Sequence, residues 1–196
     1  MKTARLEAFT DGVVAIIITI MVLEIHVPQG GDLTALKAEV PVLLAYVLSY
    51  LNVGIFWNNH HHMLHVTDRV NGKILWANLA LLFWLSLVPF VIRWIDEAGF
   101  VAAPTAAYGV VLAFAGLSYT TLRAQIIALN GHDSRLAVAT GNDVKGKLSM
   151  LLYAGAIPLA FVWPWVAILI YVTVALMWLV PDKRIESLVG KKESSA

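Results

Sequence analysis

Four histidines in one short segment are the residues best suited to chemistry: His60, His61, His62 and His65. Histidines four positions apart on a helix, here His61 and His65, can share a metal ion, although a zinc site needs a third ligand. No glutamate of the HExxH type follows them, and the chain contains no cysteine. We therefore predict no metal site, and we interpret one or two of these histidines as hydrogen-bond partners of another helix.

Asp11 is the second candidate, because it lies just inside the first apolar segment. An ionised carboxylate in a helix embedded in hydrocarbon costs several kcal/mol unless it is paired or hydrogen-bonded. Asp11 is therefore either an ion or proton site or a structural anchor with partners nearby. Its position away from the apolar stripe of its own helix favours the structural role.

That apolar stripe is the third candidate. At about 100° per residue, Ile16, Ile20 and Leu23 fall on one face of a helix, with Thr19 at its edge. An ordinary packed helix would show a similar stripe, so the spacing alone assigns it no function. The chain shows no convincing Ser-His-Asp arrangement, carboxylate pair, glycine-rich phosphate loop or TVGYG filter. We predict no enzyme activity, no catalytic residue and no cofactor.

The composition of the chain is that of a membrane protein. Of its 196 residues, 59% are hydrophobic and 14% are charged, whereas about a quarter are charged in a typical soluble domain. The mean hydropathy is +0.75. A net charge of +1 with no dense basic face argues against nucleic acid as a partner. The lack of cysteine excludes disulfides and thiolate chemistry.

Six apolar segments predict an all-α, polytopic membrane protein with six transmembrane helices. They lie near residues 8–27, 38–62, 73–95, 101–129, 147–162 and 164–181. The last two are separated only by Trp163 and Pro164, so they form either a tight hairpin or a single kinked helix. We expect one transmembrane domain over residues 1–182 and a short cytoplasmic tail over residues 183–196.

The distribution of Lys and Arg predicts that both termini are cytoplasmic. Basic residues gather at the N-terminus, in the second and fourth loops and in the tail, whereas the opposite loops hold mainly Lys37 and Arg93. Two cytoplasmic termini require an even number of crossings, which supports six. The acidic residues Glu7 and Asp11, near the start of the first apolar run, favour a retained helix over a cleaved signal peptide.

The opening motif resembles the RxxxFSD signature of the family of the lysosomal potassium channel transmembrane protein 175, with threonine in place of serine: Arg5, Phe9, Thr10 and Asp11. Further agreement lies in Trp57-x-x-x-His61, in Asn78-Leu79 and in the run from Leu87 to Phe90. The motifs cover the first three predicted helices, and hydropathy alone covers the others. The length is that of bacterial members, which carry one six-helix repeat per chain.

This resemblance implies a homotetramer in the plasma membrane of a bacterium, with a central pore lined by the first helix of each copy. By position, the apolar constriction of the family falls on Ile16, with further layers on Ile20 and Leu23, while Thr19 could offer a hydroxyl to ions. A polar network would fasten this helix to its neighbours without touching ions: Arg5, Phe9, Thr10, Asp11, Trp57, His61 and Asn78. The implied permeant ions are K⁺ and other monovalent cations.

A ring of four isoleucines can close a pore by dewetting. Selectivity would then rest on the cost of dehydration, so we expect a modest preference for K⁺ over Na⁺. Glu24, near the outer mouth, could concentrate cations by its field. The main alternative is a secondary ion or proton transporter, which would usually show internal repeats or broken helices with charges at the midplane. Neither feature is evident in the sequence. A less favoured alternative is an intramembrane metalloprotein built on the histidine cluster of residues 60–65.

Overall fold

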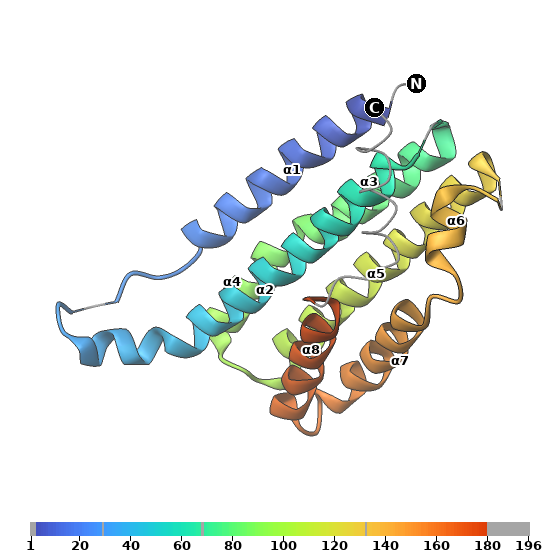
Figure 1. Cartoon of the computed structure of the whole chain (residues 1–196). Coiled ribbons are helices and arrows are strands. Elements are labelled where there is room, and N and C mark those ends of the chain that lie inside the picture. Colours follow the sequence, from blue (N-terminus) through green and yellow to red (C-terminus); the bar gives the residue numbers. More distant parts are fainter. Residues whose placement is uncertain (1–2, 29, 68, 132, 180–196) are drawn as a thin grey trace.

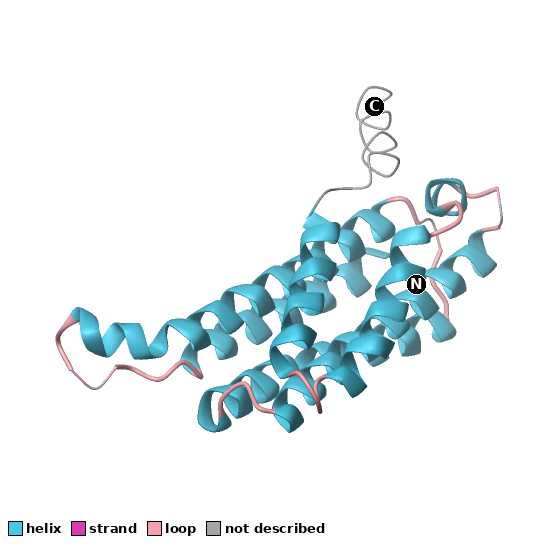
Figure 2. Cartoon of the chain, turned by 90° about the horizontal axis from the view of Figure 1, so that it is seen from below, coloured by secondary structure: helices cyan, strands magenta, loops and turns pink. Residues whose placement is uncertain are grey.

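The computed structural model describes residues 3–28, 30–67, 69–131 and 133–179, and its regular elements there are all α-helices (Figures 1 and 2). They are α1 (Thr3–Leu23), α2 (Leu33–His65), α3 (Gly72–Ser86), α4 (Val88–Ala98), α5 (Ala102–Asn130), α6 (Arg135–Thr140), α7 (Val144–Leu159) and α8 (Pro164–Leu179). The prediction of an all-α chain is therefore confirmed for these residues. The predicted tail, residues 183–196, lies outside them.

Polar side chains in the loops explain where several helices begin. The carboxylate of Asp32 accepts a hydrogen bond from the backbone N–H of Ala35 at the start of α2. The Asn71 side chain caps α3 in the same way, and Ser134 and Asp143 cap α6 and α7. Such caps satisfy N–H groups that have no partner inside the helix. These polar residues thus fix the N-terminal ends of α2, α3, α6 and α7.

Four of the six predicted segments are long and apolar enough to cross a membrane. They are α1, residues 39–65 of α2, the tandem α3–α4 (residues 72–98) and α5. The helices α7 and α8 have 16 described residues each. At 1.5 Å per residue such a helix is about 24 Å long, below the ~30 Å of a bilayer core. The count of six crossings therefore stays a prediction.

The third segment, predicted near residues 73–95, corresponds to one candidate span over residues 72–98, which is interrupted at a single residue. The helix breaks at Leu87, whose N–H bonds to the carbonyl of Trp84 three residues back at 3.2 Å. Pro89 explains the break, because it has no N–H and its ring clashes with the carbonyl four residues before it. The segment continues as α4 after a single residue.

The joint at Trp163 and Pro164 forms a hairpin. After α7 ends, the N–H of Trp163 bonds back to the carbonyl of Leu159 at 2.8 Å, and α8 returns beside α7 (Figure 1). At the other end of the pair, the indole N–H of Trp178 donates to Ser149 Oγ at 2.8 Å. These contacts exclude the alternative of a single kinked helix.

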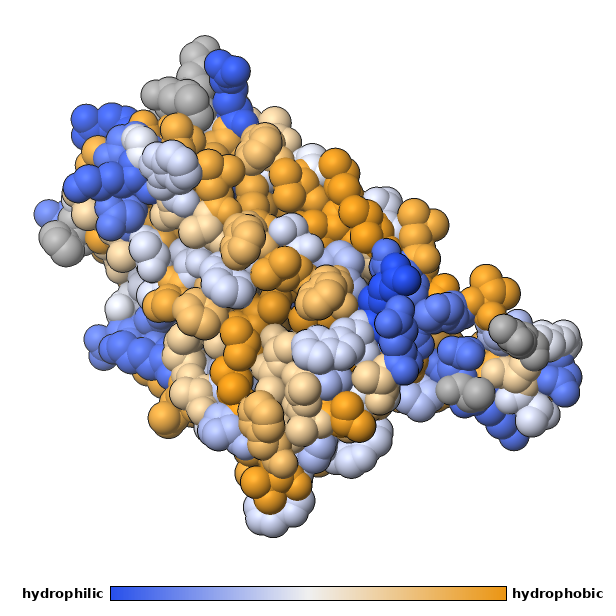
Figure 3. Space-filling model, turned by 180° about the vertical axis from the view of Figure 1, so that it is seen from behind, coloured by the Kyte–Doolittle hydropathy of each residue, from blue (hydrophilic) through white to orange (hydrophobic). Residues whose placement is uncertain are grey.

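The helix α5 lies in the middle of the bundle and packs against α3, α4, α7 and α8, while α1 lies at its edge against α2, α3 and α4 (Figure 1). We call the end that holds the start of α1 and the loop after α2 the N-terminal end, and the end that holds the α4–α5 connection the far end. Apolar side chains dominate the surface between the two ends (Figure 3). Such a surface suits a hydrocarbon environment.

Candidate functional site

The two faces of α1 have opposite surroundings. One face is buried against the rest of the chain: Leu6, Thr10, Val14, Ile17 and Met21. The predicted stripe lies on the other face, where Ile16 is 59% exposed, Ile20 is 40% exposed and Leu23 is 81% exposed. The chain therefore does not use this stripe for its own core. It is available to lipid, to water or to other copies of the chain.

Thr19 lies on the same exposed face. Its hydroxyl donates to the carbonyl of Ile16 at 2.8 Å, so the hydroxyl oxygen keeps lone pairs for a further ligand. Beside the stripe, a groove of about 410 Å³ separates α1 from α4, and Ile16, Pro89 and Phe90 contribute to its walls.

A buried hydrogen-bonded bridge ties the opposite face of α1 to two other helices. The amide nitrogen of Asn78 in α3 donates to Thr10 Oγ1 of α1 at 3.0 Å. The amide oxygen of Asn78 lies 2.7 Å from Nε2 of His60 in α2, and the two atoms share a hydrogen bond. All three residues are buried, so each polar group depends on its partner.

Two further contacts join α1 to α2 near the N-terminal end. The indole N–H of Trp57 donates to Asp11 Oδ1 at 2.8 Å. A carboxylate oxygen of Glu7 lies 2.8 Å from Nδ1 of His61. The rings of Trp57 and His61 stack with their centres 5.9 Å apart. The Asp11 carboxylate thus has a partner on a neighbouring helix, and that partner is Trp57.

The structure does not bring every residue of the predicted network into these contacts. Phe9 is 52% exposed and Arg5 is exposed too, both on α1. Within the described part of the chain, neither belongs to the hydrogen-bonded bridges above. A role for them in fastening α1 within one chain has no contact to support it.

At the far end, a charged cluster changes the expectation for Glu24. Arg93 of α4 pairs with Glu24 at 3.1 Å and with Glu97 at 2.9 Å. The positive charge of Arg93 offsets much of the field of Glu24, so Glu24 alone is a weak attractor of cations. His26 contacts Asp96 in the same region, and the hydrogen bond and charge of that carboxylate raise the pKa of the imidazole.

The comparisons with known proteins agree with this arrangement. Residues 5–89, which include α2, α3 and all but the first two residues of α1, match the family model of the endosomal/lysosomal potassium channel TMEM175. A potassium channel from a Chryseobacterium species is 49% identical over 186 residues, which cover 95% of this chain and 97% of that protein. The chain belongs to the TMEM175 family.

Two other members extend the comparison. The crystal structure of a lysosomal potassium-selective channel TMEM175 homolog from Chamaesiphon minutus superposes with a TM-score of 0.79 at 25% identity, over 92% of this chain and 97% of that chain. The human endosomal/lysosomal proton channel TMEM175 is 38% identical over 42% of this chain and 19% of its own length. The likeness to the TMEM175 structure thus extends over nearly the whole fold, including the helices that the family model leaves out.

Reasoning from the sequence missed some polar partners in this TMEM175 chain. The sequence indicates Glu7 only as an acidic residue beside the apolar run, and it does not distinguish His60 from the neighbouring histidines. An ion pair between Arg123 and Asp143 was also missed, although a single arginine inside an apolar segment is a signal in itself. Among the described residues, no group of three or more His, Asp or Glu side chains is arranged to hold a metal ion.

Proposed function

We propose that this chain is a potassium-permeable cation channel in the plasma membrane of a bacterium, with a central pore lined by the α1 helices of four copies. The observation that carries the proposal is the exposed apolar stripe of Ile16, Ile20 and Leu23 on a helix whose other face is fastened to the bundle. The Chryseobacterium relative is named a potassium channel, and its likeness extends over nearly the full chain.

The constriction would lie at Ile16, with Ile20 and Leu23 as further rings. An aliphatic ring offers no ligand to an ion that has lost water, so a narrow ring excludes ions and a slightly wider one admits them. Preference for K⁺ over Na⁺ then follows from the lower cost of stripping water from K⁺, and it is modest. On this face of α1, the hydroxyl of Thr19 is the polar group nearest the constriction, and its oxygen has free lone pairs.

The polar contacts of α1 would act as anchors and not as ion ligands. Asp11, Thr10 and their partners Trp57 and Asn78 lie on the side of α1 that faces its own chain. These contacts hold α1 in place against its own chain, so that the stripe can face the common centre of the four copies. Arg5 and Phe9, which are exposed in the single chain, would then contact a neighbouring copy.

The topology of this proposal has six crossings with both termini in the cytoplasm, in one domain over residues 1–182. The N-terminal end of the bundle is then cytoplasmic, in agreement with the basic residues near it. The short helices α7 and α8 would cross as a hairpin, and a local thinning of the bilayer can accommodate their length.

Reconstituted protein tests the proposal through Ile16→Asn, with Val22→Asn as the control. Both residues are exposed on α1, but Val22 lies about 120° around the helix from Ile16. We expect Ile16→Asn to raise single-channel K⁺ conductance about threefold or more and to lower the K⁺ over Na⁺ preference, because a polar ring stabilises partly dehydrated ions. Val22→Asn should change neither quantity.

Unaltered currents in Ile16→Asn would exclude Ile16 as the constriction. A saturable exchange flux without unitary currents would instead favour the secondary transporter.

A further inference from the structure

An apolar groove lies between α2 and α8 in the half of the bundle nearer the far end. Its volume is about 420 Å³, which is within the range of roughly 300–1,000 Å³ typical of ligand pockets. Among the described residues that line it, none is charged. The main apolar contributors are Leu44, Leu48 and Leu51 of α2, Ile168 and Val172 of α8, and Phe100 before α5. The groove therefore suits a hydrocarbon ligand.

The groove opens to the outside of the chain, away from the proposed pore. On its two sides, Leu44 of α2 is 63% exposed and Trp165 of α8 is 61% exposed. No described residue of α1 lines it, so the stripe of α1 faces elsewhere. In a membrane-spanning fold, the surroundings at this depth are hydrocarbon. A ligand can therefore enter the groove sideways from the bilayer.

The length of the groove matches one leaflet of the bilayer. Its lining on α2 runs from Val40 to Leu51, which is about 17 Å along a helix axis. The candidate membrane span of α2 begins at Glu39, directly before this stretch. A hydrocarbon core of ~30 Å gives each leaflet about 15 Å. The groove thus covers the depth that one acyl chain of the far leaflet occupies.

Aromatic rings mark the end of the groove nearer the far end. The ring of Phe100 lies 4.9 Å from that of Trp165, centre to centre, and both residues line the groove. Trp165 is the second residue of α8, directly after the hairpin turn. Tryptophan is enriched where hydrocarbon meets the polar headgroups. This end of the groove therefore lies at the level of the lipid headgroups.

Lys37 stands directly beyond that end, on the same face of α2. It precedes Pro41 by one turn, and residues 37, 41, 44, 48 and 51 follow the alternating spacing of four and three that keeps side chains on one helix face. The first turns of α2 extend beyond the other helices (Figure 1). Lys37 is exposed, and the printed positions of the chain's carboxylates give it no ion pair among the described residues.

The charges around Lys37 leave its ammonium group available to an anion. Glu39 is two positions further on, so it points about 160° away around the helix. Arg93, the other basic residue predicted at this side of the membrane, is already paired with Glu24 and Glu97. Lys37 thus provides a positive charge at headgroup level, above an uncharged groove.

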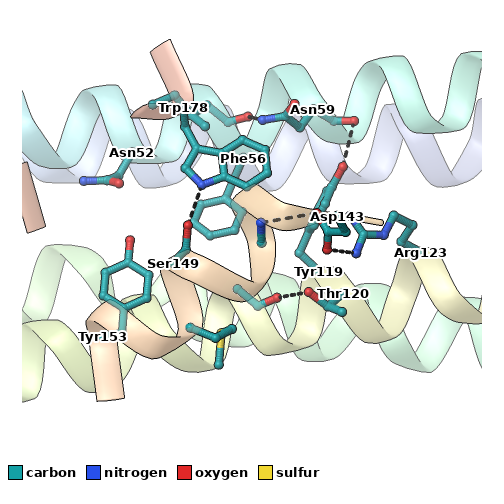
Figure 4. Close-up of a pocket in the computed structure, with 14 residues that line it drawn as sticks. Asn52, Phe56, Asn59, Tyr119, Thr120, Arg123, Asp143, Ser149, Tyr153 and Trp178 are labelled. Carbon is teal, nitrogen blue, oxygen red and sulfur yellow. Dashed lines mark hydrogen bonds and ion pairs between the residues drawn. The ribbon is translucent and has the colours of Figure 1, made fainter. Parts of the chain in front are cut away.

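The cavity beside Arg123 and Asp143 has the opposite chemistry. Its lining includes Asn59 and Tyr119, and its two charged residues pair with each other (Figure 4). The Asp143 carboxylate also accepts a hydrogen bond from the N–H of Gly146. These polar groups satisfy one another within the chain, so this cavity suits neither an acyl chain nor a headgroup.

We propose that the groove between α2 and α8 binds one acyl chain of an anionic phospholipid from the leaflet at the far end, with the lipid phosphate beside Lys37. The apolar lining removes the chain from competition with other lipids, and the ammonium group of Lys37 selects a negative headgroup. In the proposed topology this leaflet is the outer one. The site itself belongs to a single chain and does not require the central pore.

Lipid titration followed by native mass spectrometry tests the choice of headgroup. The probes are phosphatidylglycerol and phosphatidylcholine with identical acyl chains, added to purified protein in detergent. We expect Lys37→Gln to lower the apparent affinity for phosphatidylglycerol about fivefold, as for the loss of one basic residue at a lipid surface, and to change the affinity for phosphatidylcholine less than about twofold. Lys73→Gln, an exposed lysine at the N-terminal end, is the matched control and should change neither affinity.

Photolabelling locates the acyl chain. Phosphatidylglycerol with a diazirine in the middle of one chain should label residues 40–51 and 165–172 in preference to the rest of the apolar surface. Leu48→Trp should lower this labelling about fivefold, because the indole fills the space of the chain. Leu176→Trp is the control, since Leu176 is exposed on α8 and is not among the described residues of the groove.

Three results would overturn the lipid site: equal phosphatidylglycerol affinity in Lys37→Gln and the unmodified protein, uniform labelling of the apolar surface, or a groove that stays unlabelled because another copy covers it. Lys37→Gln changes an exposed side chain, so it decides the headgroup even if Leu48→Trp fails to fold. The Ile16→Asn currents test the pore separately, and their failure would leave the lipid site unaffected.

Discussion

Asn78 shows how one side chain can position a whole helix. Its amide offers a donor and an acceptor, and in this chain the donor faces Thr10 of α1 while the acceptor faces His60 of α2. Asn78 of α3 thus connects two other helices through its two amide atoms. The extra methyl of Thr10, compared with the serine of the family signature, is accommodated in a buried position without loss of the hydroxyl contact.

Asp11→Ala tests the anchor role of that carboxylate. The change removes the acceptor of the Trp57 indole, and a hydrogen bond to a charged group contributes about 1.5–3 kcal/mol. We expect a lower yield of assembled tetramer in detergent, while channels that do assemble keep their K⁺ over Na⁺ preference. Size-exclusion chromatography and current recording measure the two quantities.

Trp57→Phe is the matched variant, because it removes the donor and keeps the acceptor. Trp57→Phe should therefore also lower the yield of assembled tetramer. Normal assembly of Asp11→Ala with altered permeation would instead assign Asp11 to the ion path.

The sequence could identify the polar anchors but not their pairs. Neighbouring residues on a helix point about 100° apart, so among consecutive histidines the direction of the core decides which one is buried. In this fold the core lies on the side of His60, so His60 is buried, whereas His61 contacts Glu7. The partners of a buried group lie on other helices, whose rotation about their own axes a single sequence does not specify.

At the level of elements, hydropathy located the four segments that are long and apolar enough to cross a membrane, because each is a long apolar run. It did not predict the break at Leu87, although Pro89 was a visible signal, because a proline often bends a membrane helix without ending it. It also did not predict α6, since this helix of six residues lies in a polar stretch and has no apolar period to detect.

Gly109→Ala tests the packing of α8 against α5. A methyl group at Gly109 would collide with the hydroxyl of Tyr171, which lies against the helix backbone there. Overpacking of this kind costs about 1–3 kcal/mol, so we expect a clear fall in the thermal unfolding temperature in detergent. Gly116→Ala is the control on the same helix, because its methyl would meet Met150 at an ordinary 3.5 Å. Equal stability of the two variants would contradict the close contact.

On the scale of the whole molecule, large apolar side chains remain exposed on both α1 and the neighbouring α3–α4 tandem, including Trp76, Phe83 and Phe90. Lipid can cover such residues, but lipid gives no reason for the grooved face between α1 and α4 that Ile16 and Ile20 help to form. A symmetric assembly around α1 does give one, since each copy then presents the same stripe to a shared axis.

Subunit stoichiometry therefore tests the assembly directly. Native mass spectrometry of the purified protein should give a complex of four times the chain mass of 21.5 kDa. The chain contains no cysteine, so a single introduced thiol reports one position without interference. Leu23→Cys should form cross-linked dimers with a short bifunctional maleimide, because Leu23 would face its copies across the axis. Leu169→Cys, which is also exposed but lies on α8, should not. A monomeric mass, or equal cross-linking at both positions, would place the stripe of α1 in lipid and remove the basis for a shared pore.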